Sequence, residues 1–172
     1  MARLPSQSVL SSKQLQAIGA VAVEASNLEL LIETLIWIVC ELGEDTGRIF
    51  TDRLQLDGKL ALLREITKAR IKTPMAQEIF KKITDDISAV LPKRNTIIHG
   101  EWMAVPKALK GHAAEQGYPV AVRMKRSQPN IPPVPAREVM SVAHDLAGLH
   151  ARLWAFYLKH WHELVPSLRK RQ

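Results

Sequence analysis

Hydrophobic positions between residues 12 and 42 recur at alternating spacings of four and three, which is the period of one face of an α-helix. Ser11 or Ser12 can cap the start of this helix, and Gly43 suits its end. The pattern predicts one long amphipathic helix, and the positions of its stripe are Val21, Ala25, Leu28, Ile32, Leu35, Val39 and Leu42.

The same period predicts three more helices. The first spans about 56–69, the second begins near Pro74, and the third begins at Pro135 or Ala136 and ends between 162 and 166. Residues 44–54 are predicted to form a loop or a short turn. The inward positions, in chain order, are Leu56, Leu60, Leu63, Ile79, Ile83, Ile87, Val90, Val139, Val142, Leu146, Leu149, Leu153 and Phe156.

Pro92 falls inside the helical pattern that begins near Pro74. Proline removes one backbone donor and clashes with the preceding helical turn. We therefore expect either a kink or a fresh helical start at Pro92, and both would aim the following turn in a new direction.

Residues 101–127 change character, because alternating positions in "EWMAV" and "YPVAVRMK" favour two short strands. A polar linker over 106–117 connects them, and the proline-rich stretch that follows is extended. We expect a single all-α domain over 1–172. It would be a bundle of about four helices with a small β-hairpin insertion at 101–127 before the last helix, and a basic tail at 166–172.

The composition is that of an ordinary soluble globular domain, with 47% hydrophobic and 24% charged residues among 172. Cys40 is the only cysteine, so an intramolecular disulfide is impossible. The N-terminal stretch lacks the apolar centre of a signal peptide, and the apolar run at 30–40 is short and contains Glu33. We expect a cytoplasmic protein that does not engage a membrane.

The formal net charge of +7 has three interpretations. It is a solvated basic surface, an electrostatic footprint for a phosphate-bearing polymer, or, as the third option, a surface that meets a membrane. Five basic residues between 107 and 126 have two interpretations. They would line an RNA backbone, or they would protect the edge of a strand from pairing with another strand. These residues are Lys107, Lys110, Arg123, Lys125 and Arg126.

The stretch "RNTIIHG" gathers a cation, an amide and an imidazole at one helix end. One more step along the stripe of the second predicted helix lands on Arg94, and a guanidinium is costly to bury without a partner. Asn95 and His99 are four residues apart and share a face beside Arg94. Gly100 lets the chain turn away directly after His99.

These side chains suit cleavage of an RNA phosphodiester. Arg94 would hold the phosphate oxygens, His99 would move a proton, and Asn95 would orient the imidazole or bind phosphate. No metal or cofactor is needed, because the ribose 2′-hydroxyl is the nucleophile. The alternative is structural: Arg94 pairs with Glu78, Asp85 or Asp86, and His99 interacts with the helix dipole.

Arg94-Asn95-Thr96-Ile97-Ile98-His99 resembles the Arg-x(4–6)-His motif of HEPN domains, and the layout of helices is similar too. The resemblance implies a metal-independent RNase that dimerises and serves as a toxin, with an antitoxin partner, or in phage defence. It implies catalytic roles for Arg94 and His99, with Asn95 assisting. An acidic residue of the first helix often joins the site; Glu29 is the candidate here, Glu24 the second choice, and a solvated helix face the alternative.

A homodimer would place two copies of the motif in one cleft and so supply a second histidine. Apolar side chains on other faces of the first helix, Leu31, Ile36 and Ile38, give a reason to dimerise. The histidines lack the spacing of a helical metal site, and no glycine-rich phosphate loop is present. The alternative function is a non-catalytic HEPN-like module that binds RNA, a nucleotide or a protein.

Overall fold

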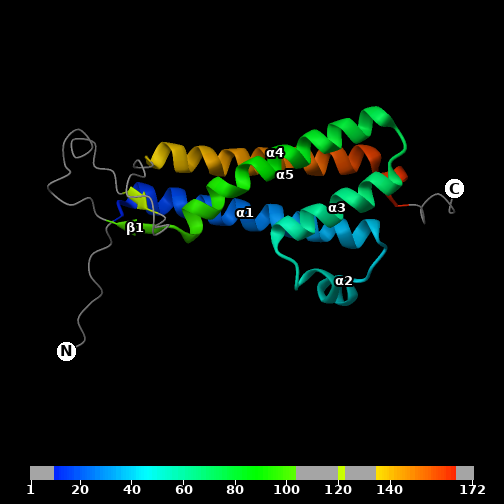
Figure 1. The fold of residues 1–172 in the computed structure, drawn as a ribbon, viewed down its shortest axis with the longest axis horizontal. Coiled ribbons are helices and arrows are strands. Elements are labelled where there is room, and N and C mark those ends of the chain that lie inside the picture. The colour runs from blue at the N-terminus through cyan, green and yellow to red at the C-terminus, as the bar shows by residue number, and fades with distance from the viewer. Residues whose placement is uncertain (1–9, 104–119, 123–134, 166–172) are drawn as a thin grey trace. The chain divides into compact units, whose positions relative to one another are not determined.

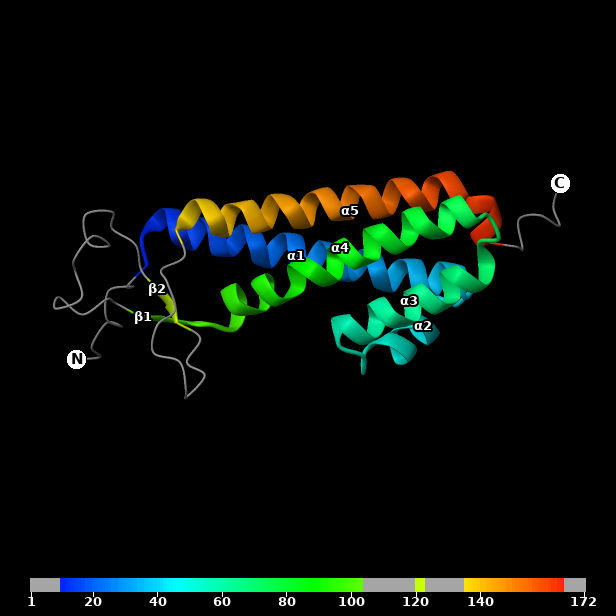
Figure 2. The same cartoon turned by 45° about the horizontal axis from the view of Figure 1, so that its top comes forward.

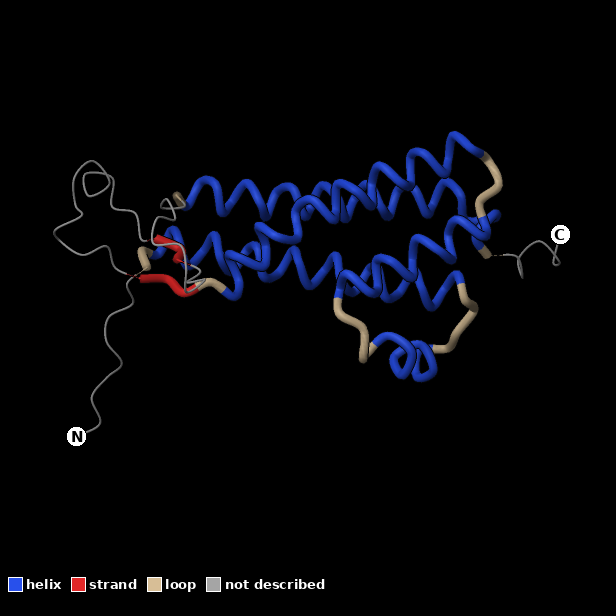
Figure 3. Tube along the Cα trace, in the orientation of Figure 1, coloured by secondary structure: helices blue, strands red, loops and turns tan. Residues whose placement is uncertain are grey.

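The computed structural model describes residues 10–103, 120–122 and 135–165 (Figure 1). The helices in this part of the chain are α1 (Ser12–Val39), α2 (Glu44–Thr51), α3 (Leu56–Arg70), α4 (Pro74–His99) and α5 (Ala136–Leu164). Two three-residue strands, β1 (Glu101–Met103) and β2 (Val120–Val122), accompany them (Figure 3). The expected all-α class is confirmed.

The chain divides into two compact units, each made of segments that are distant in sequence. Unit 1 comprises residues 1–23 and 92–144, and unit 2 comprises 24–91 and 145–172. The divisions fall inside α1, α4 and α5, so each of these helices contributes to both units. The Arg94–His99 motif belongs to unit 1, and α2 and α3 belong to unit 2.

Unit 2 has an apolar core to which four helices contribute. The predicted stripe of α1 is buried from Leu28 to Val39, and so are the inward leucines of α3 at 60 and 63. An aromatic cluster joins α4 to α5, with ring centroids 5.3 Å apart for Phe80 and Phe156 and 5.9 Å apart for Phe156 and Tyr157. In this unit α4 and α5 run side by side (Figure 2).

Leu31 and Ile36 are also buried in the chain itself. These two side chains were predicted to need a second subunit as cover, but the chain covers them itself. On α1 the large apolar side chains that remain exposed are instead Leu15, Val23 and Leu30.

Residues 44–51 form a helix, so the predicted loop is wrong there. The buried side of α2 consists of Gly47 and Thr51, while Ile49 and Phe50 are exposed. A Cβ atom at Gly47 would lie 2.5 Å from the Trp37 indole ring, and Trp37 Nε1 donates to Thr51 Oγ1 at 3.2 Å. The buried side of α2 is therefore small and polar, while its exposed side carries apolar residues. This is the reverse of the pattern that predicts an amphipathic helix.

The structure also differs from three predictions about α1 and α4. Ile79, predicted to face inward, is 39% exposed, and Phe80 is buried in its place. The first helix ends at Val39, before Leu42, and Glu41 takes a positive φ of 56° in the turn that follows. The helix α4 continues through Pro92, so the alternative of a fresh helical start is wrong.

In unit 1, Ser11 caps the start of α1 together with Gln14. The Ser11 amide donates to Gln14 Oε1 at 2.9 Å, and Gln14 N lies 3.4 Å from Ser11 Oγ, which is the reciprocal arrangement of a capping box. The strands β1 and β2 pair antiparallel, with Trp102 opposite Ala121. The predicted hairpin stays a prediction, because residues 104–119 lie outside the described residues.

The helix α1 is long and apolar enough to cross a membrane by length and composition, and a third of its most apolar window is buried. A core helix of a soluble protein and a signal sequence satisfy the same two criteria. The cytoplasmic location stays a prediction.

Candidate functional site

The last two turns of α4 position the candidate site in unit 1. Ile97 is buried and anchors this end of the helix, whereas Arg94 and Asn95 are half-buried and His99 is exposed. The helix therefore presents these three polar side chains at its surface, where a ligand can reach them.

The three side chains meet. Arg94 Nη1 donates to Asn95 Oδ1 at 3.0 Å and lies 3.5 Å from His99 Nε2, near the outer limit for a hydrogen bond. Guanidinium nitrogens only donate, so His99 Nε2 can accept from Arg94 only in the neutral tautomer that carries its proton on Nδ1. The predicted convergence of Arg94, Asn95 and His99 is present in the structure.

No carboxylate within the described residues pairs with Arg94. Two of the acids proposed as its structural partners are occupied elsewhere, since Asp85 pairs with Arg64 and Lys81, and Asp86 pairs with Arg152. Arg94 Nε is buried and makes no hydrogen bond in the described part of the chain. An unsatisfied buried donor on a cation is uncommon in native proteins.

Two residues after the motif hold the helix end in place. A Cβ atom at Gly100 would lie 2.3 Å from the Thr96 carbonyl oxygen, so only glycine fits this close turn. Trp102 is half-buried, and its indole Nε1 donates to the Ile97 carbonyl at 3.3 Å. That bond satisfies one of the carbonyls that every helix leaves without an intrahelical partner. Trp102 is thus part of the support for the site.

Glu29 is placed in unit 2 and has a different partner. Its carboxylate accepts from Lys59 Nζ at 2.6 Å, and Glu33 accepts from the same ammonium. The sequence did not predict this pairing, and the role of Glu29 beside Arg94 and His99 stays a prediction. Burial lowers the pKa of Lys59, but the hydrogen bonds that Lys59 donates to the two carboxylates, together with their negative charge, outweigh it, and the net shift is upward.

The other sequence-derived site residues give no further geometry. Lys107, Lys110, Arg123, Lys125 and Arg126 lie outside the described residues, so the basic rail along RNA stays a prediction. Across residues 10–103, 120–122 and 135–165, no group of three or more histidine, cysteine or acidic side chains is close enough to hold a metal ion.

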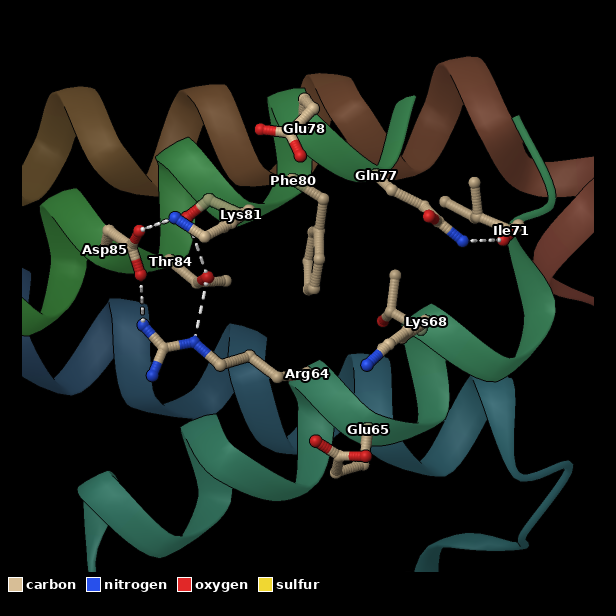
Figure 4. Close-up of a pocket in the computed structure, with 11 residues that line it drawn as sticks. Arg64, Glu65, Lys68, Ile71, Gln77, Glu78, Phe80, Lys81, Thr84 and Asp85 are labelled. Carbon is tan, nitrogen blue, oxygen red and sulfur yellow. Dashed lines mark hydrogen bonds and ion pairs between the residues drawn. The ribbon is translucent and has the colours of Figure 1, made fainter. Parts of the chain in front are cut away.

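Unit 2 carries a pocket between α3 and α4, with a volume of about 360 Å³ (Figure 4). The Phe80 ring projects into its centre. Arg64 spans one wall, where it donates to Thr84 at 2.9 Å and to Asp85 and Ser88 at 3.1 Å each. Lys81 holds the other oxygen of Asp85 at 2.9 Å, and this hydrogen bond lowers the pKa of that carboxyl. This network links α3 to α4 and so braces the two helices.

Neither Lys59 nor Arg64 was singled out from the sequence. Lys59 immediately precedes Leu60 on the inward side of α3, and a charged residue at a core position is a signal that a buried partner exists. Which carboxylates serve as that partner depends on a contact between α1 and α3, which no local pattern reveals.

Comparison with family models, with curated proteins and with solved structures found no match for this chain.

Proposed function

We propose that this chain is a HEPN-like, metal-independent endoribonuclease whose catalytic groups are Arg94 and His99. One observation carries the proposal. A half-buried guanidinium without a carboxylate partner in the described residues lies 3.5 Å from an exposed imidazole at the end of one helix.

The chemistry needs only these groups and the RNA. The ribose 2′-oxygen attacks the adjacent phosphorus, the bond from phosphorus to the 5′-oxygen breaks, and a cyclic phosphate and a 5′-hydroxyl result. Arg94 donates to the non-bridging oxygens, on which charge builds up during the attack. His99 accepts the 2′-hydroxyl proton or protonates the leaving 5′-oxygen, because histidine changes charge near neutral pH. Asn95 accepts from Arg94 at 3.0 Å and so orients the guanidinium.

Cleavage needs two proton transfers, one from the 2′-hydroxyl and one to the leaving 5′-oxygen, and a single histidine performs only one of them at a time. We propose that a homodimer supplies the second, with two copies of the motif facing each other across a twofold axis. The proposal also includes the finer fold features: a four-helix bundle formed by the long helices, and a hairpin at 101–127 whose basic residues follow the RNA backbone. An antitoxin protein is the proposed regulator, and the cytoplasm the proposed location.

The test is cleavage of a fluorophore-labelled RNA by purified protein in EDTA, with product ends identified by mass spectrometry. We expect cyclic phosphate ends from the wild type and loss of cleavage in both Arg94→Ala and His99→Ala. The matched controls are Lys93→Ala, an exposed cation on the preceding residue, and His144→Ala, an exposed histidine of α5. Both controls should retain cleavage.

Equal cleavage by the wild type and the two motif variants would contradict the proposal. If no preparation cleaves RNA but the wild type binds it and Arg94→Ala does not, the alternative function is correct. The chain would then be a HEPN-like module that binds RNA without catalysis.

A further inference from the structure

Unit 2 contains a groove between α4 and α5 that the proposed nuclease site does not use. Its volume is about 330 Å³. Ile83 and Phe156 form a buried floor, and Ile79 extends the floor to the surface with 39% of its area exposed. Met75, one turn before Ile79 on the same face of α4, is 71% exposed. Solvent-exposed apolar surface that continues out of a groove is typical of a site for a partner.

Every charged side chain in the lining, histidine aside, is a cation. Lys82 comes from α4, and Arg152 and Lys159 come from α5. Arg152 pairs with Asp86 at 2.8 Å, whereas neither Lys82 nor Lys159 has a hydrogen-bond or ion-pair partner among the residues that the structure describes. The remaining titratable group is His160, whose Nδ1 lies 3.1 Å from Glu163 Oε1. The groove therefore offers unmatched positive charge above an apolar floor.

We propose that this groove binds an acidic amphipathic helix of a partner protein. The spacing of the cations matches the repeat of a helix. Arg152 and Lys159 are seven residues apart on α5, which is about 10 Å along the helix axis. Acids at positions i and i+7 of a partner helix have the same spacing, so one can lie beside Lys159 while the other shares Arg152 with Asp86. The residues at i+3 and i+4 of that helix then face the floor, which is the pattern of helix-in-groove recognition.

The chain itself does not supply such a segment. Segments 1–9, 104–119, 123–134 and 166–172 each carry more basic than acidic residues, with Glu115 their only acid. A second copy that meets this groove through its own groove is disfavoured, because the lysines of both copies would face each other; the homodimer proposed above meets through the motif of unit 1 instead. The occupant is therefore a different, acidic protein, and the inference stands whether or not the chain cleaves RNA.

The experiment measures fluorescence anisotropy of labelled helical peptides of about 18 residues against the full chain. One peptide has a leucine face flanked by glutamates seven residues apart. A second has the same composition with glutamates four residues apart, and a third has lysine in place of glutamate. We expect saturable binding of the first peptide, at least about tenfold weaker binding of the second, and none of the third.

The protein variants are Lys82→Glu/Lys159→Glu and Ile79→Asp, with Lys13→Glu/Lys68→Glu as the control pair. The two pairs change the net charge equally, and Lys13 and Lys68 are exposed residues outside the groove. We expect at least about tenfold weaker binding for both groove variants and a change within about twofold for the control pair. Thermal unfolding checks that each variant is folded.

Three results would overturn the proposal. The first is no saturable binding of the peptide with seven-residue spacing. The second is equal weakening by the groove pair and the control pair, which would indicate general attraction to a basic protein. The third is binding of a medium-chain fatty acid, below its micelle concentration, without binding of any peptide. That result would assign the groove to a single-headed anionic amphiphile.

Discussion

Two arginines in this protein have opposite surroundings. Arg64 of unit 2 donates to Thr84, Asp85 and Ser88, and Asp85 is held in turn by Lys81. Arg94 of unit 1 contacts Asn95 and His99, its Nε is buried without a hydrogen bond, and no carboxylate pairs with it in the described residues. Arg64 is a brace between two helices, while Arg94 keeps its capacity to bind an anion.

The difference shows how to separate structural from functional polar groups in one fold. A structural network is closed, because each donor has an acceptor supplied by the protein. The Arg94 cluster is incomplete, and the protein supports it from outside: Gly100 permits the close turn after α4, and Trp102 donates to the Ile97 carbonyl. Substitutions in unit 2 should therefore change stability, and substitutions at the end of α4 should change activity.

The largest expected effects come from replacing Arg94 or Arg64, one at a time, with alanine. Arg94→Ala should reduce RNA cleavage by about a thousandfold with little change in the free energy of unfolding, because it removes the group that stabilises charge on phosphate. Arg64→Ala should do the reverse, with a loss of about 2 kcal/mol of stability and unchanged cleavage by the folded fraction. Kinetics and urea titrations on both variants check this. Equal losses of activity would show that Arg94 and Arg64 do not differ in function.

Lys59→Met should lower the free energy of unfolding by about 3 kcal/mol. The substitution leaves Glu29 and Glu33 close together without the ammonium that they share, and removal of one partner of a buried ion pair is strongly destabilising. Urea denaturation followed by circular dichroism measures the change. Lys68→Met, an exposed lysine on the same helix, is the control and should stay within about 0.5 kcal/mol of the wild type.

Gly100→Ala should reduce cleavage about tenfold and cost about 1 kcal/mol of stability, because the new Cβ must displace the Thr96 carbonyl and with it the last turn of α4. The measurement is kcat/KM for RNA together with the melting temperature. Gly148→Ala offers a matched comparison, since nothing lies within 4 Å of its added Cβ. It should be neutral or slightly stabilising, and if the two variants behaved alike, the tight turn at Gly100 would not matter for the site.

The smallest effect concerns acid stability. The hydrogen bond from Lys81 lowers the pKa of Asp85 below its ordinary value of 3.8. A carboxyl with a depressed pKa stabilises the fold above its unfolded pKa and loses that contribution as pH falls through the folded pKa. We expect Asp85→Asn to be less stable than the wild type at neutral pH, with the difference shrinking below about pH 4. Denaturant titrations across that range measure it, and a difference independent of pH would contradict the assignment.

Local periodicity was enough to locate the main helices. The stripe of α1 is buried as predicted, and so are Ile83, Ile87 and Val90 of the separate stripe on α4, because a helix repeats its faces with a fixed period. The pattern failed where packing depends on a distant element. Residues 44–51 form α2 although their inward side is Gly47 and Thr51, since that side is fitted to the Trp37 ring. Ile79 was predicted to face inward, but Phe80 is buried instead. Aromatic side chains of α5 pack against this side of α4, and that contact decides which of the two adjacent apolar residues is buried.

The sequence by itself determined that a cation, an amide and an imidazole share one helix end, because their spacing and the helical repeat are both local properties. The tertiary structure alone decided which charged groups are satisfied. Asp85 pairs with Arg64 and Lys81, Asp86 pairs with Arg152, and Glu29 pairs with Lys59. No carboxylate among the described residues pairs with Arg94. Charge pairing is a contact between elements that are far apart in the chain, and spacing along one helix cannot encode it.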